Sequence, residues 1–201
     1  MIDVGANIGV FTLFAKLCSP RAAVYAIEAI PETFDVLQAN IGLHHLENVH
    51  AFQAAAGLHE HAVRRFTFYP NMAGNSTANP DFKQHEYAFM TKILGQERTD
   101  WFFEKRERTA EVRTLSSIIQ SSRITEIDYL KIDVEGDELD VLPGISPRQY
   151  GMIRQIAVEV HTPDREERTR GRLSQMGLKA LTGKGISEGT GVVTVYAARQ
   201  R

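Results

Sequence analysis

The stretch D-V-G-A-N-I-G at residues 3–9 stands between a short apolar segment and an apolar run from Val10 to Leu17. This order is typical of a strand, a glycine loop and a buried helix. Gly5 and Gly9 carry no Cβ, so the loop can turn tightly and its backbone can approach a ligand closely. Asn7 occupies a middle position, and asparagine tolerates positive φ better than most residues. The stretch therefore predicts a ligand-binding loop at the N-terminus of a helix.

The acids near this loop indicate which ligand it binds. A dinucleotide fingerprint would read G-x-G-x-x-G and would place a pyrophosphate on the helix N-terminus. Here Asp3 precedes the glycines, and its carboxylate would repel a pyrophosphate but accept hydrogen bonds from the amino group of an amino acid. Glu28, at the end of the next predicted strand, is placed to accept both ribose hydroxyls. We therefore expect S-adenosylmethionine as the cofactor; the alternative is a structural glycine turn with a surface glutamate.

Strands alternate with helices along the chain, which is typical of a parallel sheet covered by helices on both faces. The predicted strands are Ile2–Val4, Ala23–Glu28, Val49–Ala54, Ile127–Asp133, Gln155–His161 and Val192–Ala198. The predicted helices are Val10–Leu17, Pro31–Ile41, Leu115–Gln120, Asp137–Leu142 and Asp164–Met176. We expect an α/β, doubly wound, mostly parallel sheet of the seven-stranded type, whose last strand pairs antiparallel with a neighbour that begins near Leu178. Ala62–Tyr69 alternates in polarity like an edge strand or a hairpin arm.

Residues 70–109 interrupt this pattern with a long polar segment that contains several aromatic residues. They lie between the third and fourth predicted strands, so their ends are anchored beside the crevice at the carboxyl ends of the strands. A structureless segment of this length is usually functional or disordered, and its aromatic residues argue against disorder. We predict a single domain over residues 1–201, with an insertion at 70–109 that closes over the crevice and selects the substrate. The alternative is a surface excursion with a small core of its own.

A second group of charged residues lies where the fourth and fifth predicted strands end. Lys131, Asp133 and Glu135 alternate along the fourth strand, so they share one face while the strand lasts. Glu159 and His161 repeat the spacing on the next strand. Charges are expensive to bury unpaired, so they require a partner or a chemical task. We predict catalytic roles for these five residues; the alternative is an ion pair from Lys131 to Asp133 or Glu135 that closes the strand.

Two chemical tasks suit this group. His161 is a candidate general base for a substrate hydroxyl, because the ordinary pKa of histidine lies near neutral pH. Alternatively, Asp133, Glu159 and His161 hold a divalent cation that lowers the pKa of a bound hydroxyl, although no metal is assigned. A structural role is the third interpretation of His161. The remaining histidines show no metal-ligand spacing and are expected in loops or on the surface: His44, His45, His50, His59, His61 and His85.

Composition narrows the class of protein further. A formal net charge of -2 argues against broad nucleic-acid binding. Cys18 is the single cysteine and cannot form an internal disulfide, so we expect a reducing, cytoplasmic location. No run approaches the roughly 18 apolar residues that span a bilayer, and no signal peptide is recognised. Because a strand begins at Ile2, we also expect this sequence to be a piece of something longer.

Together, these motifs resemble the FkbM family of methyltransferases. The matching segments are I-D-V-G-A-N-I-G-V-F-T-L at 2–13, A-I-E at 26–28, F-Y-P-N-M-A-G-N-S-T at 68–77, R-T-L at 113–115, Y-L-K-I-D-V-E-G-D-E-L-D-V-L at 129–142, V-E-V-H at 158–161 and G-T-G at 189–191. They span almost the whole chain. The resemblance implies a class I methyltransferase fold and methylation of hydroxyl groups on sugars, macrolides and other specialised metabolites. The segments at 68–72 and 189–197 look most like FkbM domains associated with peptide or polyketide assembly lines.

The resemblance also implies which residues hold the cofactor. It assigns cofactor contacts to the loop and to the acid after the second strand, namely Asp3, Gly5, Ala6, Asn7, Gly9 and Glu28. Phe11 and Thr12, in the first helical turn, are weaker candidates. Ser76 and Thr77 match a family segment that lies near the cofactor.

The expected function is methyl transfer from S-adenosylmethionine to a hydroxyl of a small-molecule, sugar or carrier-tethered substrate. Positioning of the reactants and removal of the hydroxyl proton are the tasks of the protein. Three alternatives remain: a non-catalytic methyltransferase-like binding domain, a nicotinamide oxidoreductase, and an RNA ribose methyltransferase that would use Lys131 and Asp133. The oxidoreductase is disfavoured because the chain contains no Tyr-x-x-x-Lys pair, and the RNA enzyme because of the acidic net charge.

Overall fold

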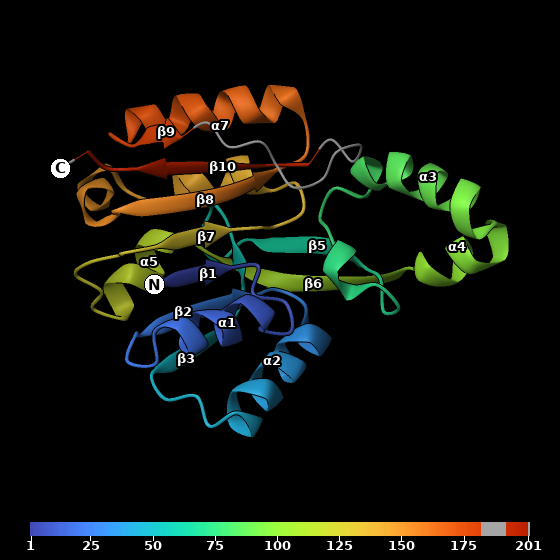
Figure 1. The fold of residues 1–201 in the computed structure, drawn as a ribbon, viewed down its shortest axis with the longest axis horizontal. Helices are drawn as coiled ribbons and strands as arrows, with labels where there is room; N and C mark the ends of the chain where they lie inside the picture. Colours follow the sequence, from blue (N-terminus) through green and yellow to red (C-terminus); the bar gives the residue numbers. More distant parts are fainter. Residues whose placement is uncertain (182–191, 201) are drawn as a thin grey trace.

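The central sheet of the chain carries the predicted alternation of strands and helices. In the computed structural model, which describes residues 1–181 and 192–200, the strand order is β3-β2-β1-β7-β8-β10-β9. The strands are β1 Ile2–Val4, β2 Val24–Glu28, β3 Val49–Gln53, β7 Leu130–Ile132, β8 Gln155–Val160, β9 Lys179–Leu181 and β10 Val193–Ala198. The first five in the order pair in parallel, and β10 runs antiparallel to both of its neighbours (Figure 1). The predicted seven-stranded, mostly parallel sheet with an antiparallel last strand is confirmed.

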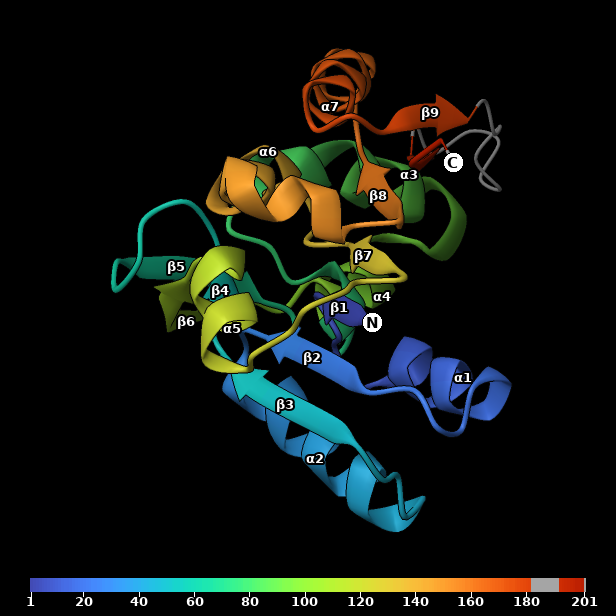
Figure 2. The ribbon, with the colours of Figure 1, turned by 90° about the vertical axis from the view of Figure 1, so that its left-hand side faces the viewer.

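Alternating side chains of the sheet contact helices on its two faces. Ile27 belongs to a core that includes residues of α5 (Leu115–Ser121), α6 (Glu138–Val141) and α7 (Pro163–Gln175). Its neighbour Ala26 packs instead with Phe34 and Leu37 of α2 (Pro31–Leu43). Helix α1 (Val10–Cys18) also contacts β2, and Figure 2 shows α2 lying along β3. The doubly wound arrangement therefore follows from the two-residue period of the strands.

A second, three-stranded sheet was not predicted. Its order is β4-β6-β5, with β4 Ala55–Ala56, β5 Val63–Phe68 and β6 Arg106–Arg113. The segment expected as an edge strand or hairpin arm is β5, which pairs antiparallel with β6 along its whole length. Of β6, only Glu111–Arg113 shows a regular pattern in the sequence. The R-E-R-T-A-E-V-R stretch carries few apolar residues, and half of its residues are exposed.

The insertion at residues 70–109 is not the irregular segment that its pattern indicated. It contains the short 3₁₀ helices η1 Ala73–Asn75 and η2 Pro80–Lys83, then α3 Gln84–Leu94, α4 Gln96–Phe102 and the start of β6. None of the residues of α3, all of which the structure describes, is buried, and Phe89, Ile93 and Trp101 of the two helices are exposed. Without a buried apolar stripe the helical period does not show in the sequence. In Figure 1 these two helices extend away from both sheets.

Two predicted elements are shorter in the structure. The fourth strand of the large sheet spans Leu130–Ile132, since Ile127 makes only an isolated bridge to Ile153. The helix expected at 137–142 is α6 at Glu138–Val141, followed by the 3₁₀ helices η3 Leu142–Gly144 and η4 Pro147–Met152. The G-T-G motif at 189–191 lies outside the described residues. In the described part of the chain, no helix has the length and apolarity that crossing a membrane requires.

Candidate active site

The glycine loop adopts a left-handed backbone at Gly5 (φ 73°), Asn7 (φ 49°) and Gly9 (φ 90°). A Cβ at Gly5 would lie 1.7 Å from the carbonyl oxygen of Asp133, and a Cβ at Gly9 would lie 2.6 Å from Cδ1 of Leu37. Close packing against the end of β7 therefore requires a glycine at position 5. At position 9 the positive φ favours glycine, since the Leu37 side chain can shift. The predicted loop is present, and it brings Asp133 beside the turn.

Glu28 holds this loop to the end of β2. Its carboxylate accepts hydrogen bonds from the backbone N–H of Asn7, the backbone N–H of Ile30 and the hydroxyl of Thr33, each at 2.8 Å. Its burial raises the pKa of the carboxyl, although these hydrogen bonds act in the opposite direction. The side chain also forms part of a cavity wall. Glu28 thus shapes the loop and faces the space below it.

That cavity has a volume of about 300 Å³ and lies where the two sheets and the insertion meet. Its apolar wall comes from the residues after β2 and from Ala54–Ala56 and Phe66. Its polar wall combines the glycine loop, the segment Ala73–Ser76 and the turn after β7. Six of the residues predicted for the site line the cavity: Gly5, Asn7, Glu28, Ser76, Asp133 and Glu135.

The other residues predicted to contact the cofactor do not line the described cavity. Asp3 is 0% exposed, accepts a hydrogen bond from Thr12 Oγ1 at 2.7 Å, and pairs with Lys131 Nζ at 3.4 Å. Burial raises the pKa of Asp3 against the effect of the Lys131 charge. The predicted cofactor residues that do not line the cavity are Asp3, Ala6, Gly9, Phe11, Thr12 and Thr77. Asp3 therefore supports the loop from the α1 face of the sheet.

Lys131 pairs with carboxylates on two strands. Its ammonium lies 3.1 Å from Asp133 Oδ2 and 3.4 Å from Asp3 Oδ1, and 5.3 Å from the ring centroid of Phe11. Burial would lower its pKa, but the two carboxylates outweigh that effect and raise it. Glu135 does not continue the alternation, because β7 ends at Ile132 and the φ of Glu135 is 51°. The Lys131–Asp133 ion pair is formed, and Glu135 points elsewhere.

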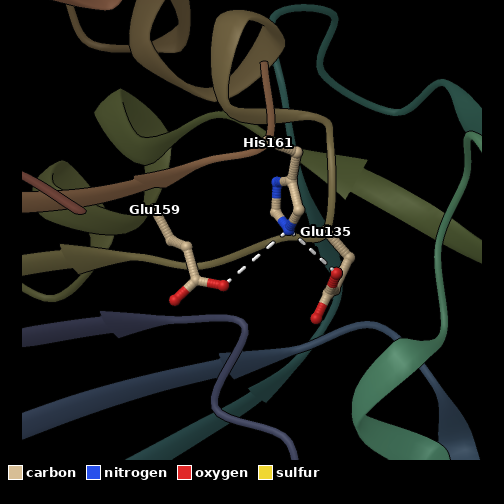
Figure 3. Close-up of side chains that lie close together, drawn as sticks. All are labelled: Glu135, Glu159 and His161. Carbon is tan, nitrogen blue, oxygen red and sulfur yellow. Dashed lines mark ion pairs between the residues drawn. The ribbon is translucent and has the colours of Figure 1, made fainter. Parts of the chain in front are cut away.

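Glu135 meets His161 at the end of β8 (Figure 3). His161 Nε2 lies 3.1 Å from Glu135 Oε2 and 3.7 Å from Glu159 Oε1, and its Nδ1 lies 3.4 Å from Glu138 Oε1. Burial would lower the pKa of His161, but the hydrogen bonds and charges of Glu135 and Glu138 outweigh it and raise the pKa to about 10. The carboxylates that face both ring nitrogens therefore favour the imidazolium form of His161 at neutral pH, and that form cannot accept a proton.

Glu159, unlike His161, has a pKa close to neutral pH. Its side chain is 32% exposed, and burial together with the charges of Asp133 and Glu135 raises its pKa to about 7. A carboxyl with this pKa exchanges a proton readily at neutral pH. Of the five charged residues predicted here, Glu159 is the one best suited to proton transfer.

The divalent-cation hypothesis named Asp133, Glu159 and His161. Among the described residues, the three that bring ligand-type atoms within 4.8 Å of one another are Glu135, Glu159 and His161. Glu135 already contacts two cations, His161 and Lys83. The structure thus brings together a different set of residues from the one predicted, and binding of a divalent cation stays a prediction.

Several residues of the site carry no signal in the sequence. Lys83, from η2, lies 2.7 Å from Glu135, and Asn79 Nδ2 donates a hydrogen bond to Asp137 Oδ1 at 2.5 Å. Phe66 and the small residues 54–56 reach the cavity from the second sheet. All of them depend on contacts between distant parts of the chain, and none stands in a recognisable motif.

The order of the large sheet, its antiparallel last strand and the glycine loop below an acidic second strand define a class I methyltransferase fold. A crystal structure of a methyltransferase FkbM from Methylobacillus flagellatus superposes with a TM-score of 0.62 at 16% sequence identity, over 98% of this chain and 42% of that one. The chain belongs to the FkbM methyltransferase family, since the model of the methyltransferase FkbM domain matches residues 3–180.

Relatives of the chain agree with this family. It is 36% identical over 173 residues to the 31-O-demethyl-FK506 methyltransferase FkbM of Streptomyces tacrolimicus, covering 82% of this chain and 66% of that protein. It is 30% identical over 226 residues to the AMB antimetabolite synthetase AmbE of Pseudomonas aeruginosa, covering 99% of this chain and 10% of that protein. The chain spans 64–66% of the length of the first three curated relatives that it matches.

Proposed function

We propose that the chain is an S-adenosylmethionine-dependent O-methyltransferase that acts on a hydroxyl of a small-molecule, sugar or carrier-tethered specialised metabolite. One observation carries this proposal: a single cavity joins the glycine loop and Glu28 to Asp133 and Glu135 at the end of β7. A cofactor bound at the glycine loop and Glu28 would meet a substrate bound near Asp133 and Glu135. In open α/β sheets, ligands bind outside the carboxyl ends of the strands in this way.

The residues of the cavity suit the cofactor. The Oε2 atom of Glu28 accepts only one hydrogen bond from the protein and so keeps a lone pair for a ribose hydroxyl. The apolar wall around Ala54–Ala56 and Phe66 suits a flat adenine ring. Backbone groups of the left-handed loop lie at the opposite wall, next to the buried Asp3. When bound, the cofactor supplies a methyl group for in-line transfer to an oxygen. The chain then has to orient the two reactants and exclude water from them.

We assign removal of the hydroxyl proton to Glu159. A carboxylate oxygen of Glu159 lies within 4.8 Å of one of Glu135, which lines the cavity. The pKa of Glu159, raised to about 7 by burial and by neighbouring carboxylates, leaves a useful fraction ionised at neutral pH. His161 instead acts as a fixed cation, because Glu135 and Glu138 hold its pKa at about 10. This assignment replaces the role of His161 as general base.

Two alternatives lose support. A catalytic lysine for RNA ribose methylation would have to be Lys131, whose ammonium is engaged by Asp3 and Asp133. The family match over residues 3–180 is to a methyltransferase domain. It therefore argues against a nicotinamide oxidoreductase and against a domain that only binds a partner. The relative from S. tacrolimicus is named for O-methylation, and the AmbE relative is a synthetase. Both names support a specialised metabolite, free or tethered to an assembly line, as the substrate class.

The insertion at 70–109 is proposed to contribute to substrate selection with its first part. Residues 73–76 line the cavity, whereas no residue of α3 or α4 does. Figure 1 shows these two helices extending away from the sheets. We therefore assign this wall of the substrate crevice to residues 73–76. The helical pair would lie over the crevice only after moving.

Incubation with cofactor that carries a deuterated methyl group tests the proposal. Candidate hydroxyl metabolites would be supplied free and tethered to a carrier, and the products examined by mass spectrometry and NMR. We expect the labelled methyl group on an oxygen atom. A labelled methyl group on nitrogen or carbon would contradict O-methylation.

A further inference from the structure

Lys83 of the insertion is a buried lysine that no part of the assigned chemistry uses. It is 6% exposed, and its ammonium lies 2.7 Å from Glu135 Oε2 and 3.2 Å from Glu86 Oε2. Burial alone would lower its pKa, but these two carboxylates outweigh burial and raise the pKa. The lysine is therefore charged and paired. A buried charge with such contacts is costly to disturb, because removing it leaves its partner uncompensated.

Lys83 is the first residue in a chain of ion pairs in which basic and acidic side chains alternate. Glu135 contacts His161 at 3.1 Å, His161 contacts Glu138 at 3.4 Å, and Glu138 contacts Arg165 of α7 at 3.4 Å. The guanidinium of Arg165 then lies 4.7 Å from the ring centroid of Phe82, the residue before Lys83. This chain of contacts thus begins at Lys83 and returns to Phe82, both in η2 of the insertion, and His161 is one of its members.

The insertion also holds the backbone of the turn that carries Glu135. Thr77 Oγ1 donates a hydrogen bond to the carbonyl of Glu135 at 2.6 Å, and Asn79 Nδ2 donates one to the carbonyl of Gly136 at 3.2 Å. Glu135 and Gly136 both have positive φ, at 51° and 106°. A non-glycine residue keeps this conformation only where its surroundings enforce it. The contacts from residues 77–83 supply that enforcement.

We propose that Lys83 is a positioning residue for methyl transfer, which holds the Glu135 carboxylate against His161 and so fixes the ends of β7 and β8 around the reacting oxygen. This role rests on the proposed function. Lys83 does not line the cofactor cavity in the described structure. Its influence should therefore fall on turnover and leave cofactor affinity unchanged.

The test compares Lys83→Met with Lys83→Arg and with Lys92→Met, a change of an exposed lysine on α3 of the same insertion. For Lys83→Met we expect kcat to fall roughly 10- to 100-fold, as for other small misplacements of reacting groups, with the Kd for S-adenosylhomocysteine within about two-fold of wild type. Lys83→Arg keeps the charge and should restore most of the turnover. Lys92→Met should behave as wild type. Equal losses of turnover in Lys83→Met and Lys83→Arg, or an unchanged kcat in Lys83→Met, would overturn the proposal.

Hydrogen exchange provides a second measurement that needs no substrate. The amides of residues 133–137 should exchange roughly ten-fold faster in Lys83→Met than in Lys92→Met, while those of β1 should not change. Unchanged exchange at 133–137 would refute the positioning role whether or not the wild-type chain methylates a hydroxyl. If Lys83→Met does not fold, Lys83→Gln, which keeps an N–H donor without the charge, replaces it in both measurements. A wild-type chain that fails to methylate any hydroxyl would count against the proposed function and leave the exchange result to decide on Lys83.

Discussion

Replacing Gly5 with alanine is expected to destabilise the fold by roughly 3 kcal/mol or more. The new Cβ would lie 1.7 Å from the carbonyl oxygen of Asp133, and the φ of 73° is one that alanine rarely adopts. The oxygen cannot retreat easily, because the N–H of Asp133 donates a hydrogen bond to Val4 at 3.1 Å. The loop and the end of β7 must therefore separate.

Chemical denaturation of purified variants measures this effect. Gly171→Ala is the matched control, because Gly171 lies within α7 and a Cβ there would meet no described atom within 4 Å. In a helix, alanine is more stable than glycine by up to about 1 kcal/mol, so this control should unfold at higher denaturant. Unfolding of Gly5→Ala at the wild-type midpoint would show that the loop does not pack against β7 in this way.

Replacing Glu159 with glutamine is expected to lower turnover by roughly 10²- to 10⁴-fold, the usual cost of losing a positioned base. In wild type, the base must be ionised, and burial beside Asp133 and Glu135 raises the pKa of Glu159 to about 7. The value of kcat/KM should therefore be low in acid, increase as the pH rises through about 7, and become constant above it. Steady-state kinetics across this range would measure both the loss and the inflection.

The same profile separates the candidates for the base. An inflection near pH 10 would assign the role to His161, whose pKa is about 10. Glu167→Gln, a change of an exposed glutamate on α7, should leave the profile unaltered. Loss of activity in EDTA with recovery in Mg²⁺ would favour the divalent cation instead. Wild-type turnover in Glu159→Gln would remove Glu159 from the chemistry.

The large sheet was predictable because its elements are determined by local patterns. Apolar strands of period two alternate with helices, and the glycine loop marks the first crossing between them. The three-stranded sheet was missed for the converse reason. In β6, Arg106–Arg113, Val112 alone is buried, and in α3 none of the described residues is buried. An element that buries few side chains needs few apolar residues, so its sequence shows no clear hydrophobic periodicity.

The site was predictable where one strand end or one loop determined the position of a residue. Gly5, Glu28 and Asp133 meet at one cavity because parallel strands place their carboxyl ends together. Alternation failed at Glu135, because the strand ends before it and its backbone turns left-handed. The pairing of Lys83 with Glu135 joins residues 52 positions apart in the sequence, which no local pattern encodes.

Calorimetric titration with S-adenosylhomocysteine and with NAD tests most directly whether the cavity below the glycine loop is the cofactor site. Wild type should bind S-adenosylhomocysteine at a single site and should not bind NAD. Glu28→Gln should weaken that binding roughly ten-fold or more, because charge-assisted hydrogen bonds to ribose are lost, whereas Glu47→Gln, on an exposed turn, should not. Binding of NAD in the absence of any binding of S-adenosylhomocysteine would contradict the account, and unchanged affinity in Glu28→Gln would place the cofactor elsewhere.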